Sequence, residues 1–253
     1  MKAIFKTDTG KVRSHNEDNG GVFVNNSGEF LAIVADGMGG HKAGEVASQC
    51  AVSHLKEQWQ QVERMLTPAQ AETWFRTNIS AVNKQILKYS RENQALEGMG
   101  TTIVAVIVTD KFATVANIGD SRCYVMNDQG YKQLTEDHSF VNELVKTGQI
   151  TPEDAAHHPR KNIVLKAVGT EPEIEMDTKT ITFEKGDKIL LCSDGLSDKV
   201  TKDEMESILK EQGNVEEKAG KLIQMANQYG GEDNISLAII EYEARGESRC
   251  TEC

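Results

Sequence analysis

Three short apolar runs along the chain each end in a small residue followed by an aspartate. The runs are L-A-I-V-A-D-G, V-A-N-I-G-D-S and I-L-L-C-S-D-G, and they place Asp36, Asp120 and Asp194 at their ends. Runs of this length fit one buried strand, and a strand holds its last side chain more firmly than a loop does. The pattern therefore predicts rigid carboxylates at the ends of three strands.

Other segments of the chain carry strand or helix signals. Runs rich in Val and Ile predict strands over residues 21–25, 30–35, 101–108, 113–119, 122–126, 188–193 and 235–241. Apolar residues at helical spacing follow the G-G-H at 39–41, the capped start at Thr67 and Pro68, and the capping-box pair Thr201 and Glu204. A further helical stripe begins at Val215.

The order of these elements favours a layered α+β domain, because strands cluster and helices cluster without strict alternation. No proline-rich or serine-rich linker divides the chain, so we expect one domain over residues 1–243 and a polar C-terminal tail over 244–253. Residues from about 140 to 168 carry no strand signal and include His157, His158, Arg160 and Lys161. We expect a flap inserted over one edge of the domain, where such excursions often carry specificity.

The composition is ordinary for a soluble globular protein, with 38% hydrophobic and 26% charged residues. A formal charge of −11 argues against a nucleic-acid partner, because phosphate-backbone binding requires Lys and Arg. The first residues lack a signal-peptide core, and no run approaches the roughly 20 apolar residues that span a bilayer. Five cysteines without a disulfide-like spacing fit a reducing compartment, and we read C-T-E-C in the tail as incidental. We therefore expect a cytoplasmic protein.

Two further aspartates stand beside predicted strands, Asp18 in R-S-H-N-E-D and Asp233 in G-G-E-D-N. Singly, such residues are more often turn or cap residues, but five junctions together favour a shared role. A carboxylate set without His or Cys suits Mg²⁺ or Mn²⁺. Two such ions about 3.5 to 4 Å apart activate a bridging water for attack on phosphorus. The predicted reaction is phosphoester hydrolysis, with Arg13 able to hold two phosphate oxygens.

Two other functions use similar residues. A two-metal nuclease or phosphodiesterase would also need carboxylates, but its polyanionic substrate requires a basic track that this chain lacks. A regulatory module that binds divalent ions without catalysis is a third reading. The five aspartates all stand intact, which gives that reading little support.

Seven motifs follow one another in this order along the chain: R-S-H-N-E-D, V-A-D-G-M-G-G-H, G-M-G-T-T, I-G-D-S-R, L-T-E-D-H-S, L-C-S-D-G-L and G-G-E-D-N-I-S. This ordered set resembles the bacterial branch of the protein phosphatase 2C (PPM) family. The resemblance covers nearly the whole chain. It implies a four-layer α/β/β/α sandwich in which helix pairs flank two mostly antiparallel sheets. It also implies Mn²⁺- or Mg²⁺-dependent removal of phosphate from phosphoserine and phosphothreonine in proteins.

The resemblance also implies how two Mn²⁺ or Mg²⁺ ions are held. Asp36 should bridge both ions. Asp194 and Asp233 would complete one site, while Asp18 and the backbone carbonyl of Gly37 would serve the other, partly through water.

Further expectations follow from the same resemblance. A third, weaker ion would be held by Asp120 together with Asp194, and Arg13 would bind the substrate phosphate. Arg122 and the pair Thr101 and Thr102 would orient the acidic residues without reacting. Bacterial relatives commonly oppose a membrane-anchored Ser/Thr kinase, so we expect phosphorylated proteins, including such a kinase, as partners. Nothing in the sequence demands more than a monomer.

One position departs from the better-known eukaryotic pattern, which has a histidine after the D-G pair as the proposed general acid. The residue here is Met38. A Ser or Thr alkoxide is a poor leaving group, so a proton donor matters for alkyl phosphates. His41, three residues on, or a metal-bound water would take that role, and a histidine that only packs or meets solvent is an equally good reading.

Overall fold

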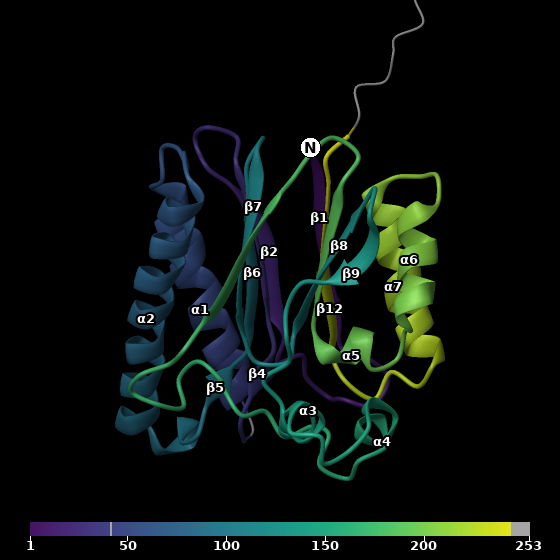
Figure 1. Ribbon diagram of the computed structural model, residues 1–253. Coiled ribbons are helices and arrows are strands. Elements are labelled where there is room, and N and C mark those ends of the chain that lie inside the picture. Colours follow the sequence, from purple (N-terminus) through teal and green to yellow (C-terminus); the bar gives the residue numbers. More distant parts are fainter. Residues whose placement is uncertain (41, 244–253) are drawn as a thin grey trace, which may run out of the picture.

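Two five-stranded antiparallel sheets stack face to face, with helices on both outer faces, in the computed structural model (Figure 1). The structure describes residues 1–40 and 42–243. One sheet has the order β10-β7-β6-β3-β2 and lies against helices α1 and α2, and the other has the order β1-β12-β11-β8-β9 and lies against α6 and α7. This arrangement confirms the predicted α+β class and the four-layer α/β/β/α sandwich.

The strands are β1 (Lys2–Asp8), β2 (Asn19–Val24), β3 (Phe30–Ala35), β4 (Gly37–Met38), β5 (Gly100–Thr101), β6 (Ile103–Val108), β7 (Phe112–Ile118), β8 (Arg122–Asn127), β9 (Gly130–Gln133), β10 (Asp177–Thr182), β11 (Lys188–Cys192) and β12 (Ile235–Glu241). The helices are α1 (Ala43–Gln60), α2 (Pro68–Glu92), the 3-10 turn η1 (Gln94–Leu96), α3 (Phe140–Lys146), α4 (Pro152–Ala156), α5 (Asp194–Ser197), α6 (Lys202–Lys210) and α7 (Val215–Gln228).

Strand β6 shows why the central strands read as unbroken apolar runs. Every residue of β6 is buried. Val104 and Val106 face the opposite sheet, while Ile103 and Ile107 pack in the layer that includes α1 and α2. A strand covered on both faces needs apolar side chains at every position.

The helices begin where the sequence predicts. Thr67 accepts a hydrogen bond from the backbone of Gln70, whose side chain in turn caps Thr67, and Pro68 follows at the first helical position of α2. Thr201 and Glu204 form the same box at α6. These reciprocal caps satisfy amide groups that have no partner inside the helix.

Four strands were not predicted: three lie at the edges of the five-stranded sheets, and the fourth, β4, has only two residues. Strands β1, β9 and β10 occupy edge positions. Strand β10, with the sequence D-T-K-T-I-T, contains no fully buried residue, so it lacks the apolar signal of the central strands. The predicted strand over 101–108 is two strands, β5 and β6. The break falls at Thr102, whose amide donates to the backbone oxygen of Asp36 at 2.8 Å.

The predicted flap segment lies at one end of the sandwich, beyond the strand ends that carry the aspartates (Figure 1). It contains the short helices α3 and α4 and no named strand. An isolated bridge between Ser139 and Val164 joins the two arms of the segment, and another between Thr101 and Val168 ties its last residue to β5. No helix among residues 1–40 and 42–243 is long and apolar enough to cross a membrane.

Replacing Gly195 by alanine is expected to cost several kcal/mol of unfolding free energy. A Cβ at Gly195 would lie 1.9 Å from the backbone oxygen of Asn234, so α5 and the 230–234 loop would have to separate. Gly220 in α7 is the matched control. Its nearest neighbour for a Cβ is 3.8 Å away, so Gly220→Ala should stabilise the helix by up to about 1 kcal/mol. Thermal melting of both variants checks this; equal melting temperatures would contradict it.

Candidate metal centre

The structure brings the five predicted aspartates to one end of the sandwich. Asp36 directly follows β3, while Asp120 and Asp194 each stand two residues beyond the end of a strand. Asp18 directly precedes β2, and Asp233 lies two residues before β12. Neighbouring antiparallel strands alternate in direction, so residues after some strands and before others meet at the same edge.

Mutual repulsion shows how closely these carboxylates gather. Burial raises the pKa of Asp36 well above its usual range, and the charges of Asp18, Asp194, Asp120 and Asp233 raise it further. Asp36 also lies within hydrogen-bond reach of Asp194. An acid that feels four others in this way is at the centre of the group.

Three of the other aspartates also lie in surroundings that disfavour their negative charge. Burial raises the pKa of Asp18 to about 7, although hydroxyl groups of Ser236 and Ser193 oppose the shift. Burial, with the charge of Asp194, raises the pKa of Asp120 to about 7. Burial and then the charge of Asp198 raise the pKa of Asp194 to about 6.

Two buried carboxylate oxygens have no hydrogen-bond partner, Oδ1 of Asp18 and Oδ1 of Asp194. An unpaired buried carboxylate oxygen is costly unless a cation or a proton meets it. Among residues 1–40 and 42–243, no three acidic, histidine or cysteine side chains already converge as ligands of one ion. The two unpaired carboxylate oxygens are nevertheless of the type that hard divalent cations such as Mg²⁺ or Mn²⁺ prefer.

Asp36 is fixed by hydrogen bonds to Thr101, the last residue of β5, and to Thr102, which follows it. The Asp36 amide donates to Oγ1 of Thr102 at 3.0 Å, and Oγ1 of Thr101 donates to the Asp36 backbone oxygen at 2.9 Å. Oγ1 of Thr102 in turn lies 2.8 Å from Oγ of Ser121. These contacts support the prediction that the two threonines orient the acidic group. Gly37 is needed because a Cβ there would lie 2.2 Å from the backbone oxygen of Gly44.

Two supporting residues were missed by the sequence reading, Ser193 and Asn234. Oγ of Ser193 donates to Oδ2 of Asp18 at 2.8 Å. Asn234 donates from Nδ2 to the backbone oxygens of Thr9 and His15, both at 2.9 Å, and its Oδ1 accepts from the amide of Glu17. Asn234 therefore joins the loop before β2 to the loop before β12. Both residues lie inside the motifs quoted above and directly beside an aspartate. Their position next to a candidate ligand was the signal in the sequence that could have identified them.

Arg13 lies in the loop between β1 and β2 and faces an aspartate of the group. Its Nη2 donates to Oδ2 of Asp233 at 2.8 Å, and half of the Arg13 side chain is exposed. The amide of Lys11 donates to the backbone oxygen of Gly231 at 2.7 Å, which holds the Arg13 loop against the 230–234 loop. The structure thus places a partly exposed guanidinium at the rim of the acidic centre.

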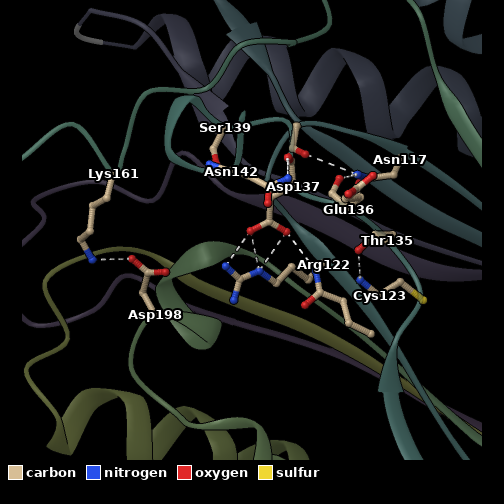
Figure 2. A network of polar contacts seen from close by, with 12 residues as sticks. Asn117, Arg122, Cys123, Thr135, Glu136, Asp137, Ser139, Asn142, Lys161 and Asp198 are labelled. Carbon is tan, nitrogen blue, oxygen red and sulfur yellow. Dashed lines mark hydrogen bonds and ion pairs between the residues drawn. The ribbon is translucent and has the colours of Figure 1, made fainter. Parts of the chain in front are cut away.

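A cavity of about 470 Å³ lies beside Asp120 and Asp194, between the sandwich and the flap segment. Arg122 forms a two-pronged ion pair with Asp137 in its wall, with Nη2 2.6 Å from Oδ2 (Figure 2). Nζ of Lys161 lies 2.7 Å from Oδ2 of Asp198 on another side. The sequence reading named Arg122 as a support but missed both acidic partners, Asp137 and Asp198. Neither follows a strand, so neither carried the signal used for the aspartates.

Two sequence predictions lie outside the described residues. His41, the candidate proton donor, is one, and the C-terminal tail with Cys250 and Cys253 is the other. The thiols of Cys50, Cys123 and Cys192 are free.

Without metal ions, the protein is expected to melt at a higher temperature at pH 5 than at pH 8. Unfolded aspartates titrate near pH 3.9, but Asp18, Asp120 and Asp194 have a folded pKa of about 6 to 7. Between these values the folded chain binds protons that the unfolded chain does not, so stability falls as pH rises and the full penalty is present above about pH 7. Thermal melting in chelator at both pH values tests this. Saturating Mn²⁺ should weaken the dependence, and a higher melting temperature at pH 8 in chelator would contradict it.

A two-sheet sandwich with an acidic centre at its strand ends is the architecture that the motif resemblance implies for metal-dependent protein phosphatases. The family profile described as protein phosphatase 2C matches residues 10–228. The serine/threonine phosphatase stp of Listeria welshimeri is 51% identical over 241 residues, which cover 95% of this chain and 96% of the relative.

Solved structures agree with the sequence relatives. The serine/threonine phosphatase Stp1 from Staphylococcus aureus superposes with a TM-score of 0.91 at 42% identity, covering 96% of this chain and 95% of that chain. The catalytic domain of the phosphatase PstP, solved in complex with two manganese ions, superposes with a TM-score of 0.83 at 33% identity, covering 96% of this chain and 98% of that chain. The chain therefore belongs to the protein phosphatase 2C family.

Proposed function

We propose that this protein is a metal-dependent serine/threonine phosphatase that removes phosphate from phosphoserine and phosphothreonine in proteins. The observation that carries the proposal is the group of five aspartates, four of which have a raised pKa and two of which have an unpaired buried oxygen, in a chain of this family. Such a group is unfavourable by itself and becomes favourable when divalent cations are bound. Two Mn²⁺ or Mg²⁺ ions are the proposed cofactors.

Five residues of the chain are proposed to bind the two ions. Asp36 is the proposed ligand shared by both ions, since it feels the charge of the other four aspartates. Asp194 and Asp233 would complete one site, and Asp18 with the backbone carbonyl of Gly37 the other. When bound, the ions supply a nucleophilic water at neutral pH and neutralise charge on the phosphate.

Arg13 is the proposed phosphate-binding residue. One of its nitrogens, Nη2, already bonds to Asp233, which fixes the plane of the guanidinium beside the acidic centre. The remaining N–H groups of the guanidinium can donate to two phosphate oxygens in the fork geometry that arginine favours. A phosphate held there would lie next to the ligands of the ions.

A third, weaker ion is proposed at Asp120 and Asp194. Asp120 is 8% exposed. Burial raises its pKa most, and the negative charge of Asp194 is the next largest cause. Both residues line the cavity beside the flap, so an ion there would be reached from the cavity.

Two candidates remain for the group that donates a proton to the leaving alkoxide. Met38 has no proton to donate, so either His41 or a metal-bound water is proposed for the role. The pH dependence of phosphopeptide hydrolysis by His41→Ala distinguishes them, because an unchanged rate and acid limb would remove His41 from the mechanism.

The proposed partners are phosphorylated proteins, including a Ser/Thr kinase that the phosphatase opposes. The flap residues His157, His158, Arg160 and Lys161 are where we expect substrate contacts. A monomer in the cytoplasm is the proposed working form, and three free thiols are consistent with a reducing compartment.

The function is tested by assaying phosphoserine, phosphothreonine and phosphotyrosine peptides after chelation, with Mn²⁺, Mg²⁺ or Ca²⁺ added back. We expect release of phosphate from phosphoserine and phosphothreonine peptides only with Mn²⁺ or Mg²⁺. Oligonucleotides and cyclic dinucleotides serve as the comparison for a phosphodiesterase. Hydrolysis of those diesters, or no metal-dependent release from any substrate, would overturn the proposal.

A further inference from the structure

We propose that His138 is a positioning residue that fixes the turn presenting Asp120 and ties this turn to the flap segment. The evidence is a set of four hydrogen bonds that converge on one buried residue in the L-T-E-D-H-S motif. The inference rests on the proposed function only where it concerns the ion assigned to Asp120.

His138 binds both backbone groups of Gly119, the residue before Asp120. The His138 amide donates to the backbone oxygen of Gly119 at 2.9 Å, and the Gly119 amide donates to Nδ1 of His138 at 3.1 Å. Gly119 has a φ of +108°, a conformation that few other residues adopt. His138 holds this turn from outside, because its Nδ1 accepts a hydrogen bond from Gly119 and its amide donates one to Gly119.

The Gly119 contact fixes the tautomer of the imidazole. Because an amide donates to Nδ1, that nitrogen must present its lone pair, and the ring proton lies on Nε2. Nε2 is 3.1 Å from Oδ2 of Asp177 on β10, which is therefore the acceptor. The two ring nitrogens therefore make different contacts: Nδ1 accepts from the turn before Asp120, and Nε2 donates to the edge strand β10.

The backbone of His138 reaches the flap segment. Its carbonyl accepts a hydrogen bond from the amide of Leu165 at 2.7 Å, next to the bridge between Ser139 and Val164. The other end of the segment is tied at Val168 to Thr101, a support of Asp36. His138 therefore links the returning arm of the flap to the turn that presents Asp120.

A buried histidine that merely fills space is the alternative, since the His138 side chain is only 7% exposed. A space-filling role would not depend on which ring nitrogen is replaced. Asparagine places an amide oxygen near the position of Nδ1, while glutamine places an amide group near the position of Nε2. His138→Asn therefore retains the acceptor for Gly119, and His138→Gln retains the donor to Asp177 but loses that acceptor.

The first readout needs no metal. Amide hydrogen exchange by NMR, in chelator, should show a slowly exchanging Gly119 amide in the wild type and in His138→Asn. In His138→Gln the same amide should exchange at least about tenfold faster, because a hydrogen bond to a fixed acceptor is lost. Asp177→Asn is the matched control, since its amide oxygen still accepts from Nε2, and Gly119 exchange should be unchanged.

The second readout is Mn²⁺ binding by calorimetry without substrate. Loss of a residue that orients a ligand typically weakens metal binding by about tenfold or more, so the weakest ion should bind at least about tenfold less tightly to His138→Gln. His138→Asn should stay within about twofold of the wild type. Fast Gly119 exchange in both variants, or in neither, would overturn the positioning role.

Two further measurements keep the outcomes separate. If His138→Gln does not fold, nitrogen chemical shifts of the wild-type imidazole decide, because a proton on Nδ1 would by itself overturn the proposal. Asp120→Asn tests the proposed third ion independently. Unchanged binding of the weakest ion to Asp120→Asn would remove that assignment, whereas the Gly119 exchange pattern would still decide the role of His138.

Discussion

Replacing Asp36 by asparagine is expected to reduce Mn²⁺-dependent hydrolysis of a phosphopeptide on the order of 10³-fold or more. Burial raises the pKa of Asp36, and the charges of the four other aspartates raise it further. An amide has no negative charge and only one good ligand oxygen, so the variant cannot neutralise two divalent cations at once. Both the binding of the ions and the nucleophilic water that they would supply should be weakened.

The same change is expected to stabilise the protein when metal is absent. Asparagine removes a buried carboxyl group whose ionisation burial and the four other aspartates oppose, so Asp36→Asn should melt at a higher temperature than the wild type in chelator at pH 8. Activity and stability would then move in opposite directions, which simple damage to the fold cannot produce. Asp110→Asn, in an exposed loop, is the matched control. Full activity of Asp36→Asn would contradict the proposed centre.

Replacing Arg13 by alanine is expected to lower kcat/KM for a phosphopeptide by about 10²-fold, since charge-assisted hydrogen bonds to phosphate contribute roughly 1.5 to 3 kcal/mol. Arg13→Lys should recover only part of the loss, because an ammonium group cannot bind two oxygens in a fork. Steady-state kinetics on one phosphoserine peptide provides the measurement. The exposed Arg64→Ala is the control.

Ion binding should respond differently to loss of Arg13. The guanidinium neutralises Asp233 in the structure, so its removal leaves that carboxylate freer to meet a cation. Calorimetry without substrate should therefore show Mn²⁺ binding to Arg13→Ala that is as tight as, or tighter than, binding to the wild type. Unchanged kcat and KM would rule out Arg13 as the phosphate-binding residue, and weaker Mn²⁺ binding would contradict the neutralising contact.

The sequence indicated the central strands and the aspartates because both leave local signals. A strand buried on two faces is an unbroken apolar run, as in β6, and the aspartate that ends such a run is easy to find. The capping boxes at Thr67 and Thr201 are also local, since the paired residues are three positions apart. These features depend on residues close together along the chain.

The features that were missed depend on distant residues. Strand β10 is polar and acquires its structure by pairing with β7. Paired residues such as Thr178 and Ala116 lie about 60 positions apart in the sequence. The partner of Arg122 is Asp137, and the partner of Lys161 is Asp198, and no pattern within one segment distinguishes these acids from surface residues. Tertiary pairing overrides local propensity in such cases.

The pairing of β1 with β12 has a consequence for how the protein is made. Strand β12 lies between β1 and β11, and it is the last strand among the described residues, with Asp233 only two positions before it. During synthesis, a chain that has emerged only as far as α7 has an open gap in one sheet and lacks Asp233. Because such long-range pairing forms late, the ribosome must deliver nearly all of the described residues before a catalytic pocket exists. A chain that lacks β12 and Asp233 is therefore expected to release no phosphate.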